Sequence, residues 1–249
     1  MALHPVETDI WVSQSIVTNG VWEKPSTRIF TKFLEKHQDA LFLDIGGNIG
    51  YYSHIALANG HQTVAFEPIK SNFRVLCSTI NHNKWNDKFT LFNYAISDTP
   101  SQVSFHVRPV DQGLAKMVEG EQIIGGEENK DWAYSKVFDS FKIDYDGEII
   151  MKVDIEGHEC HLFRGIGDFF KRNTVLVVYM EWIHLSQHGC SKMIAEHLVQ
   201  NGFEPYEKDG TRKHPMEDFP WTSARQPVSK YIDIAWANAK LGVDPRKYL

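Results

Sequence analysis

FLDIGGNIGYYSHIALANG, residues 42–60, joins a short apolar run to a glycine-rich turn and then to a segment of helical character. The apolar run 40–45 predicts a buried strand, and residues 49–58 predict the helix that follows it. Glycines at a strand-to-helix turn are typical of a backbone that approaches a ligand closely. This stretch therefore indicates an α/β protein with a ligand site at the end of its first core strand.

Apolar runs alternate with amphipathic segments along the rest of the chain. Further strands are expected over 62–68, 89–97, 102–107, 147–157, 174–182, 203–207 and 230–237, and further helices over 70–82, 135–141, 159–171 and 190–201. This order predicts a doubly wound, mostly parallel seven-stranded sheet with helices on both faces and one antiparallel strand near the C-terminus.

Two regions fall outside this alternation. Residues 1–39 are expected to form a helical extension ahead of a Rossmann-like domain over 40–249. Within that domain, residues 108–132 are polar and contain four glycines. A segment of this length is too long for an ordinary connection, so it is a candidate lid over a binding site.

The composition limits the choice of partners and location. The chain has 26 basic and 32 acidic residues, and its net charge of −6 disfavours nucleic acid as the main partner. It contains no apolar run of about 18 residues, so no membrane span is expected. The N-terminus lacks the layout of a secretory signal, and Cys77, Cys160 and Cys190 are predicted to be reduced thiols. We therefore expect a cytoplasmic protein, of an oligomeric state that the sequence leaves open.

Acidic residues stand at the ends of three predicted strands. Asp44, Glu67 and Asp154 each fall at or near the carboxyl end of a strand. In an open parallel sheet, ligands bind outside these ends, where the strand order reverses. The three acids are therefore expected to meet at one ligand-binding edge.

The glycine turn does not suit a dinucleotide. When Gly47 and Gly50 are matched to the last two glycines of the G-x-G-x-x-G fingerprint, Ile45 stands at the first one. Asp44 would also place a negative charge beside the phosphates. S-adenosylmethionine has no phosphate and carries an ammonium and a sulfonium, so acids favour it. Asp44 is then expected near the cationic amino-acid end, and Glu67 near the ribose hydroxyls.

Residues 152–161, KVDIEGHECH, contain the candidate catalytic groups. On a strand, Lys152, Asp154 and Glu156 would share one face. Transfer of a methyl group to a hydroxyl or an amide needs a base, and Asp154, Glu156 and His158 are the candidates. A divalent cation held by these carboxylates and the histidine is the rival interpretation, and we favour a site without metal.

The two residues that follow have a simpler interpretation. Glu159 and His161 are expected in the first turn of the next helix. There Glu159 would favour the helix N-terminus through the dipole, and His161 would be solvated.

In this order, FLDIGGNIGYYS, VAFEPIKSNFRVL, YAISD and IMKVDIEGHECHLFRGI resemble the FkbM family of S-adenosylmethionine-dependent methyltransferases, over about residues 40–182. Asn48 stands where the commonest methyltransferase loop has its middle glycine, and asparagine tolerates a left-handed backbone better than most residues. The resemblance implies a cofactor site formed by Asp44, Gly46, Gly47, Asn48 and Gly50 at the methionine end, Glu67 and Pro68 at the ribose, and Ala95, Ile96 and Ser97 beside the adenine.

The sequence thus predicts a methyltransferase that acts on a hydroxyl of a small molecule or a glycan. Two alternatives stay open at this point. The chain could methylate a side-chain amide of a peptide, because the signals for oxygen and nitrogen acceptors are not separable here. It could also be a scaffold protein that binds the cofactor without turnover.

Overall fold

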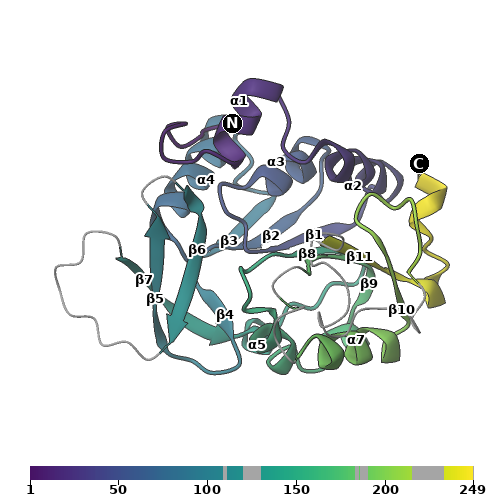
Figure 1. Cartoon of the computed structure of the whole chain (residues 1–249). Helices are drawn as coiled ribbons and strands as arrows, with labels where there is room; N and C mark the ends of the chain where they lie inside the picture. Colours follow the sequence, from purple (N-terminus) through teal and green to yellow (C-terminus); the bar gives the residue numbers. More distant parts are fainter. Residues whose placement is uncertain (109–110, 120–129, 183–184, 186–189, 215–232, 249) are drawn as a thin grey trace.

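The main body of the protein is a seven-stranded sheet (Figure 1). The computed structural model describes residues 1–108, 111–119, 130–182, 185, 190–214 and 233–248. The strands of the main sheet are β1 (Leu41–Ile45), β2 (Thr63–Phe66), β3 (Phe89–Phe92), β8 (Glu148–Val153), β9 (Thr174–Glu181), β10 (Phe203–Glu207) and β11 (Asp233–Asn238). They lie in the order β10-β11-β9-β8-β1-β2-β3. The described strands of this sheet all run in one direction except β11, which is antiparallel to both of its neighbours, β9 and β10, as the sequence predicted.

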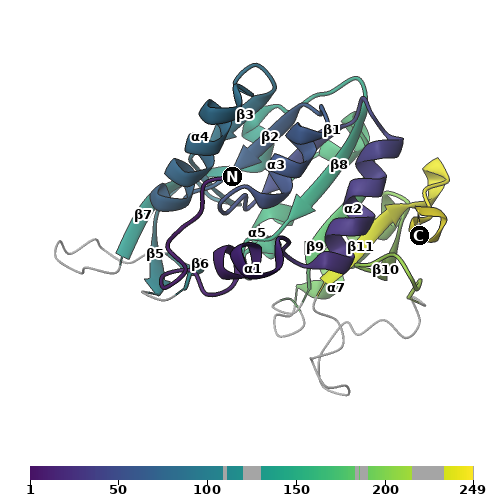
Figure 2. The same ribbon diagram turned by 90° about the horizontal axis from the view of Figure 1, so that it is seen from above.

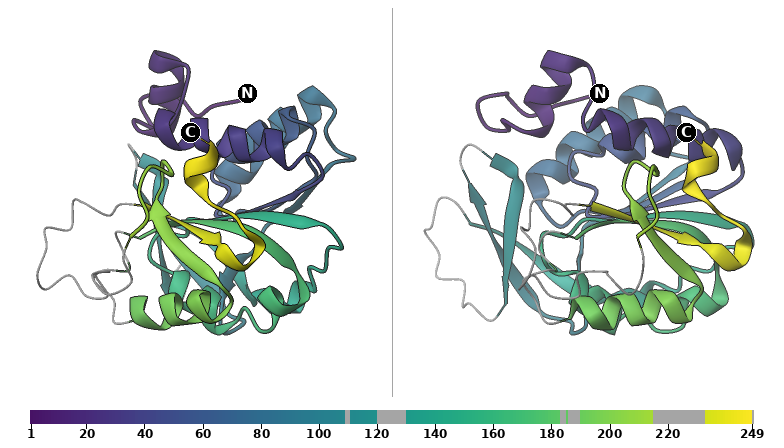
Figure 3. Two further views of the ribbon diagram at one scale, coloured as in Figure 1. Left: turned by 90° about the vertical axis from the view of Figure 1, so that its right-hand side faces the viewer. Right: turned by 45° about the vertical axis from the view of Figure 1, so that its right-hand side comes forward.

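Helices cover both faces of the main sheet (Figures 1 and 3). One face carries α2 (Lys24–Lys36), α3 (Tyr51–Ala58) and α4 (Lys70–Asn83), and the other carries α5 (Glu159–Arg164), α6 (Phe169–Arg172) and α7 (Ser191–Gln200). Alternate residues of β1 divide between the two layers: Phe42 belongs to the core with α2 and α3, and Leu43 to the core with α5 and α7. Because both faces are covered, β1 is buried along its whole length.

The N-terminal segment lies on the face that carries α2 and α3. A short helix, α1 (Val12–Asn19), ends at Gly20 in a left-handed conformation and leads towards α2. Figure 2 shows α1 near the end of the sheet at which α5 begins. Asp9 anchors the start of α1, since its carboxylate accepts the backbone N–H groups of Val12 and Ser13. The helix is thereby held over the edge of the sheet where the predicted acids lie.

A second, four-stranded sheet contains two segments for which the sequence predicted something else: part of the strand expected over 89–97, and the insertion over 108–132. It contains β4 (Ala95–Ser97), β5 (Gln102–Arg108), β6 (Asp111–Glu119) and β7 (Lys130–Val137), in the order β4-β7-β5-β6. The strand expected over 89–97 is therefore two strands in different sheets. The chain turns between them at Asn93, whose amide donates to the backbone carbonyls of Glu67 and Pro68.

The insertion over 108–132 is also largely strand rather than a loop. It supplies β6 and the start of β7, which pair with β5, while residues 109–110 and 120–129 lie outside the described residues. The helix expected over 135–141 is likewise the end of β7 followed by a single 3-10 turn, η1 (Phe138–Phe141).

Two boundaries differ further along the chain. The helix expected over 159–171 divides into α5 and α6, and Gly167 between them has a φ of 58° that most residues avoid. The last predicted strand is β11, described from Asp233 to Asn238, and residues 230–232 of the expected strand lie outside the described residues. No described helix is long and apolar enough to cross a bilayer.

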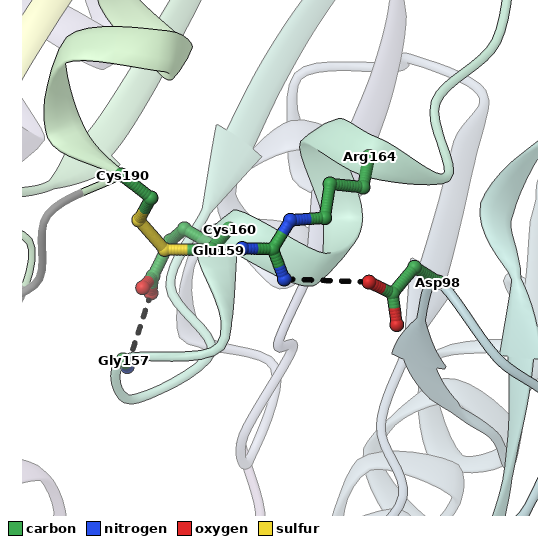
Figure 4. Close-up of a disulfide and its surroundings, with 6 residues drawn as sticks. All are labelled: Asp98, Gly157, Glu159, Cys160, Arg164 and Cys190. Atoms are coloured by element: carbon green, nitrogen blue, oxygen red, sulfur yellow. Dashed lines mark hydrogen bonds and ion pairs between the residues drawn. A yellow bond between two sulfur atoms is a disulfide. The ribbon is translucent and has the colours of Figure 1, made fainter.

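The expectation of three reduced thiols is wrong. Cys160 and Cys190 form a disulfide that joins the starts of α5 and α7, while Cys77 is a free thiol (Figure 4). Their Cα atoms are 6.0 Å apart, within the usual span of a disulfide. The sequence could not indicate this pair, because the two cysteines are 30 residues apart and meet only through helix packing.

Candidate functional site

A first cavity opens at the carboxyl ends of β1 and β2 and has an empty volume of about 620 Å³. The main sheet provides one side of its wall and the second sheet the other, through Phe105 on β5 and Met117 on β6. Its full lining is Ile45, Gly46, Asn48, Phe66, Glu67, Pro68, Ile69, Asn72, Tyr94, Ala95, Ile96, Phe105, Met117, Asp154, Ile155, Glu156 and His158. The insertion therefore forms part of the wall of this cavity.

Close backbone packing explains the glycine at position 46. Its φ is 87°, and a Cβ atom there would lie 1.8 Å from the carbonyl oxygen of Asp154. Asn48 follows with a φ of 50°, which confirms the left-handed conformation expected from the sequence. Gly50 precedes α3 with a φ of 83° and packs against Leu76 and His54 rather than lining a cavity. The turn is thus fixed by contacts inside the protein as well as by its approach to the cavity.

Glu67 is the buried carboxylate of the first cavity. It is 3 % exposed, and its two oxygens accept the backbone N–H groups of Asn48 at 2.7 Å and Ile69 at 2.8 Å. Burial raises the pKa of Glu67 to about 8, against the opposing effect of these hydrogen bonds. Oε1 also accepts the side-chain amide of Asn72 at 3.5 Å, whereas Oε2 keeps a second lone pair, so this carboxylate can accept a further donor from a ligand.

Asp44 lies deeper, at the boundary with a second cavity. It is 1 % exposed, and its Oδ2 accepts the hydroxyl of Ser53 at 2.6 Å, while Oδ1 has no hydrogen-bond partner among the described residues. Burial raises the pKa of Asp44, and the neighbouring Lys152 opposes that shift. Lys152 is its register partner on β8. A buried oxygen of this kind is costly unless a donor from a ligand reaches it.

The second cavity is larger and far more acidic, with an empty volume of about 1250 Å³. It is lined by Trp11, Val12, Trp22, Glu23, Asp44, Gly47, Asn48, Ile49, Tyr51, Tyr52, Lys152, Asp154, Glu156, Glu181 and Asp233. A smaller recess of about 330 Å³ adjoins it and shares Tyr52, Lys152, Asp154, Glu181 and Asp233 with it. Asn48, Asp154 and Glu156 line both the first and the second cavity.

The predicted base candidates lie at this junction. The backbone N–H of Asp154 donates to the carbonyl of Ile45 at 2.9 Å, and its Oδ2 accepts Lys152 Nζ at 2.9 Å. Although burial opposes its charge, Asp154 and Asp44 raise the pKa of Lys152 above its ordinary value. Glu156 does not continue the strand, because its φ of 55° places it in a left-handed turn. The expected alternation on one strand face is therefore wrong for Glu156, and the turn brings it to the same cavities instead.

Three carboxylates gather here. One oxygen each from Asp154, Glu156 and Glu181 lies within 4.8 Å of the others, which is close enough to hold a divalent cation. Burial, followed by the charges of Asp154 and Glu156, raises the pKa of Glu181 to about 10. Such crowding favours the arrival of a positive charge, whether from a ligand or from a metal ion.

The histidines have other neighbours. Of the first and second cavities, His158 lines the first, where its Nε2 lies 3.4 Å from Ser97 Oγ, and it also lines an open hollow beside His161. Its ring stacks on His161 at a centroid distance of 3.9 Å, and His161 Nδ1 pairs with Asp98 at 2.9 Å. His161 is thus partly exposed, as expected, but it also has two partners that the sequence did not indicate. Glu159 does stand in the first turn of α5, fully buried, and accepts the backbone N–H groups of Ile155 and Gly157.

Most of the predicted site residues line the two cavities. Those in the first are Gly46, Asn48, Glu67, Pro68, Ala95, Ile96, Asp154, Glu156 and His158, and Asp44 and Gly47 line the second. Gly50 and Ser97 line neither. Residues that sequence reasoning missed are Ile69, Asn72, Phe105, Met117, Tyr51, Tyr52 and Asp233. Tyr51 and Tyr52 directly follow the glycine turn, which is the one signal that pointed to them.

Comparison with known protein families shows to which family the chain belongs. A sequence model of the methyltransferase FkbM domain matches residues 44–205. The chain belongs to the FkbM methyltransferase family. The match contains every residue that lines the first cavity, whereas Trp11, Trp22, Glu23 and Asp233 of the second cavity fall outside it. No curated protein sequence matches the chain significantly.

One solved structure supports the fold, and two others are more distantly similar. An FkbM methyltransferase from Methylobacillus flagellatus KT is 11% identical with a TM-score of 0.50, and the alignment covers 80% of this chain and 43% of that one. This chain therefore spans less than half the length of that protein. The C-terminal domain of precorrin-6Y C5,15-methyltransferase from Rhodobacter capsulatus is 11% identical (TM-score 0.45; 88% and 91% covered). Precorrin-6y C5,15-methyltransferase from Geobacter metallireducens GS-15 is 12% identical (TM-score 0.42; 82% and 84% covered).

Proposed function

We propose that this FkbM-family protein transfers a methyl group from S-adenosylmethionine to a hydroxyl oxygen of a small-molecule or glycan acceptor. One observation carries the proposal: the first and second cavities meet at Asp154 and Glu156. One cavity can then hold the methyl donor while the other holds the acceptor. Holding both reactants in line is a main source of rate in such a displacement.

The first cavity suits an adenosine group. Glu67 offers two buried carboxylate oxygens to the ribose hydroxyls, and Ala95, Ile96 and Phe105 give an apolar wall for the base. A pyrophosphate would instead meet buried carboxylates at Glu67 and Asp44. Oδ1 of Asp44 suits the cationic amino-acid end of the cofactor. When bound, S-adenosylmethionine supplies an electrophilic methyl group.

The two carboxylates at the junction would act on the acceptor. As its oxygen forms a bond to carbon, the hydroxyl must lose a proton, and Asp154 or Glu156 can accept it. Lys152 holds Asp154 in place through its contact with Oδ2. His158 is the less suited base, because it does not line the second cavity, where the acceptor would lie.

A divalent cation could activate the hydroxyl instead, held by Asp154, Glu156 and Glu181. We favour the mechanism without metal, because the ammonium of Lys152 lies 2.9 Å from a carboxylate oxygen of Asp154 and competes for it.

Two measurements test the proposed function. Calorimetry with S-adenosylhomocysteine should show binding at one site per chain, and NAD should not bind. Purified protein is then incubated with a cell extract and cofactor labelled in its methyl group, and mass spectrometry should find the label as a methyl ether. Folded protein that does not bind S-adenosylhomocysteine would reject the proposal, and a label found only on nitrogen would reject the hydroxyl acceptor.

A further inference from the structure

The walls of the second cavity carry an unusual combination of side chains. Its described lining has six carboxyl groups but only one lysine, together with the aromatic side chains of Trp11, Trp22, Tyr51 and Tyr52. Lys208 adds a second ammonium just behind this wall, where it pairs with Glu23 and Asp233 at 2.8 Å each. The described wall therefore holds six carboxyl groups beside two ammonium groups, and burial raises the pKa of three of the six, Asp44, Glu181 and Asp233, so that a bound cation would favour their ionisation.

Two buried polar atoms also point to a ligand. Oδ1 of Asp44 is without a hydrogen-bond partner in the described part of the chain. The same holds for the hydroxyl of Tyr179, a residue that is 5 % exposed and lines the recess. S-adenosylmethionine would account for Asp44, but Tyr179 belongs to the recess beyond Tyr52 and Lys152. A ligand with more than one polar group would satisfy it.

We propose that the second cavity binds an acceptor that carries an ammonium group beside the hydroxyl that is methylated. This inference rests on the proposed function and adds the chemical class of the substrate. Carboxylates attract an ammonium, and the faces of tryptophan and tyrosine rings bind one through their quadrupoles. The cavity is far larger than a metal ion needs, and ring carbons do not ligate metals.

The same surroundings decide which atom of the acceptor is methylated. Nearby carboxylates favour the charged form of an amine and so raise its pKa. A protonated amine has no lone pair with which to attack a methyl group. The hydroxyl oxygen is thus the nucleophile, and the ammonium serves for recognition.

A pair of probes of one shape and different charge tests the inference. Protein saturated with S-adenosylhomocysteine is titrated with choline, which has a hydroxyl and a permanent cation, and with dimethylbutanol, its uncharged counterpart. Tryptophan fluorescence is a suitable readout, because Trp11 and Trp22 line the cavity. We expect choline to bind at least about 10-fold more tightly than dimethylbutanol. Equal binding of the two, or binding of neither, would overturn the inference.

Variants with matched controls test whether the preference for choline arises in the second cavity. Glu181→Gln keeps the shape of the side chain and removes a carboxyl group that can ionise when a cation binds beside it, so the preference for choline should fall about threefold or more. Asp168→Asn is the control, since Asp168 on the surface lines neither cavity and contacts Lys171. Trp11→Ala should weaken choline binding, whereas Trp132→Ala, an exposed tryptophan on the second sheet, should not. A preference that survives both cavity variants would contradict this placement of the site.

Two further outcomes separate the hypotheses. If S-adenosylhomocysteine itself does not bind, the proposed function fails before the inference is reached. If it binds and choline shows no preference over dimethylbutanol, only the inference fails. Magnesium chloride is titrated in parallel. Tight Mg²⁺ binding that excludes choline would assign the carboxylates to a metal and overturn the inference.

Discussion

The two cavities at the edge of the sheet differ in where their walls come from. All residues of the first cavity lie between Ile45 and His158, inside the part of the chain that matches the FkbM family. The second cavity adds residues from the N-terminal helices and from β11, which lie outside that part. The first is largely apolar around one buried carboxylate, and the second is acidic and aromatic. The comparison teaches that the family region alone forms the first cavity, while the flanking segments complete the second, so under the proposed function the flanking segments would shape the acceptor side.

The largest effect should come from Gly46, which packs against the backbone of Asp154. Gly46→Ala would place a Cβ atom 1.8 Å from the carbonyl oxygen of Asp154 at a φ of 87°. Backbone atoms must move at both ends of the junction, so the free energy of unfolding should drop by about 4 kcal/mol or more, or the protein should not fold. Chemical denaturation measures the change.

Gly60→Ala is the matched control for that change. Gly60 also has a positive φ, 96°, but a Cβ atom there would meet nothing within 4 Å. Its cost should be limited to backbone strain, about 1–2 kcal/mol. Equal losses for the two variants would show that the contact between β1 and β8 does not define the turn.

The second largest effect concerns the carboxylate that both cavities share. Asp154→Asn should lower the rate of label transfer about 100-fold or more, because the base is lost, while binding of S-adenosylhomocysteine changes little. Lys152 keeps Asp44 as a neighbouring charge, so the protein should still fold. Steady-state transfer measured beside a denaturation curve separates the two effects. An unchanged rate would remove Asp154 from the mechanism and leave Glu156.

These two predictions rest on features that the sequence revealed to different degrees. The strand ends at Asp44, Glu67 and Asp154 could be predicted, because buried runs and glycine turns are local signals. The close contact of Gly46 with Asp154 could not, because it depends on two strands more than 100 residues apart. The glycine indicated a close approach, but not that its partner was another strand.

The second sheet and the acceptor side were hidden for a similar reason. Phe105 and Met117 reach the first cavity only because β5 and β6 pair and stand beside the main sheet. Asp233 joins Glu181 through antiparallel pairing of β11 with β9. The disulfide between Cys160 and Cys190 depends in the same way on helix packing. Composition and periodicity describe single segments, and these features arise from pairs of segments.

A smaller effect, confined to the first cavity, is expected for Glu67→Gln. Glutamine has one acceptor oxygen instead of two. It therefore cannot accept hydrogen bonds from the backbone N–H groups of Asn48 and Ile69 and from a ribose at the same time. Affinity for S-adenosylhomocysteine should fall about 10- to 100-fold, as calorimetry would measure. Choline binding by protein saturated with S-adenosylhomocysteine should keep its preference. Loss of that preference would mean that the two cavities are not independent.

The ionisation of Glu67 should also make stability depend on pH. Its pKa in the folded protein is raised from 4.5 to about 8, so the folded state keeps a proton that the unfolded state releases. The free energy of unfolding should therefore fall as pH rises from 4.5 to about 8, by at most about 1.4 kcal/mol per pH unit. Glu159 and Glu181 act in the same direction, since burial raises both pKa values. Denaturation at several pH values should give a shallower fall for Glu67→Gln than for the wild-type protein.

The smallest effect tests whether the second sheet belongs to the cofactor side at all. Met117→Ala removes a partly buried side chain from the wall of the first cavity. Losing part of its apolar contact should weaken S-adenosylhomocysteine binding by about 1 kcal/mol, or about fivefold. Tyr134→Ala on β7 is the control, because Tyr134 is 55 % exposed and lines neither cavity. If both variants bind as the wild type does, the second sheet is only a neighbour of the cavity. The family region of the main sheet then holds the cofactor without it.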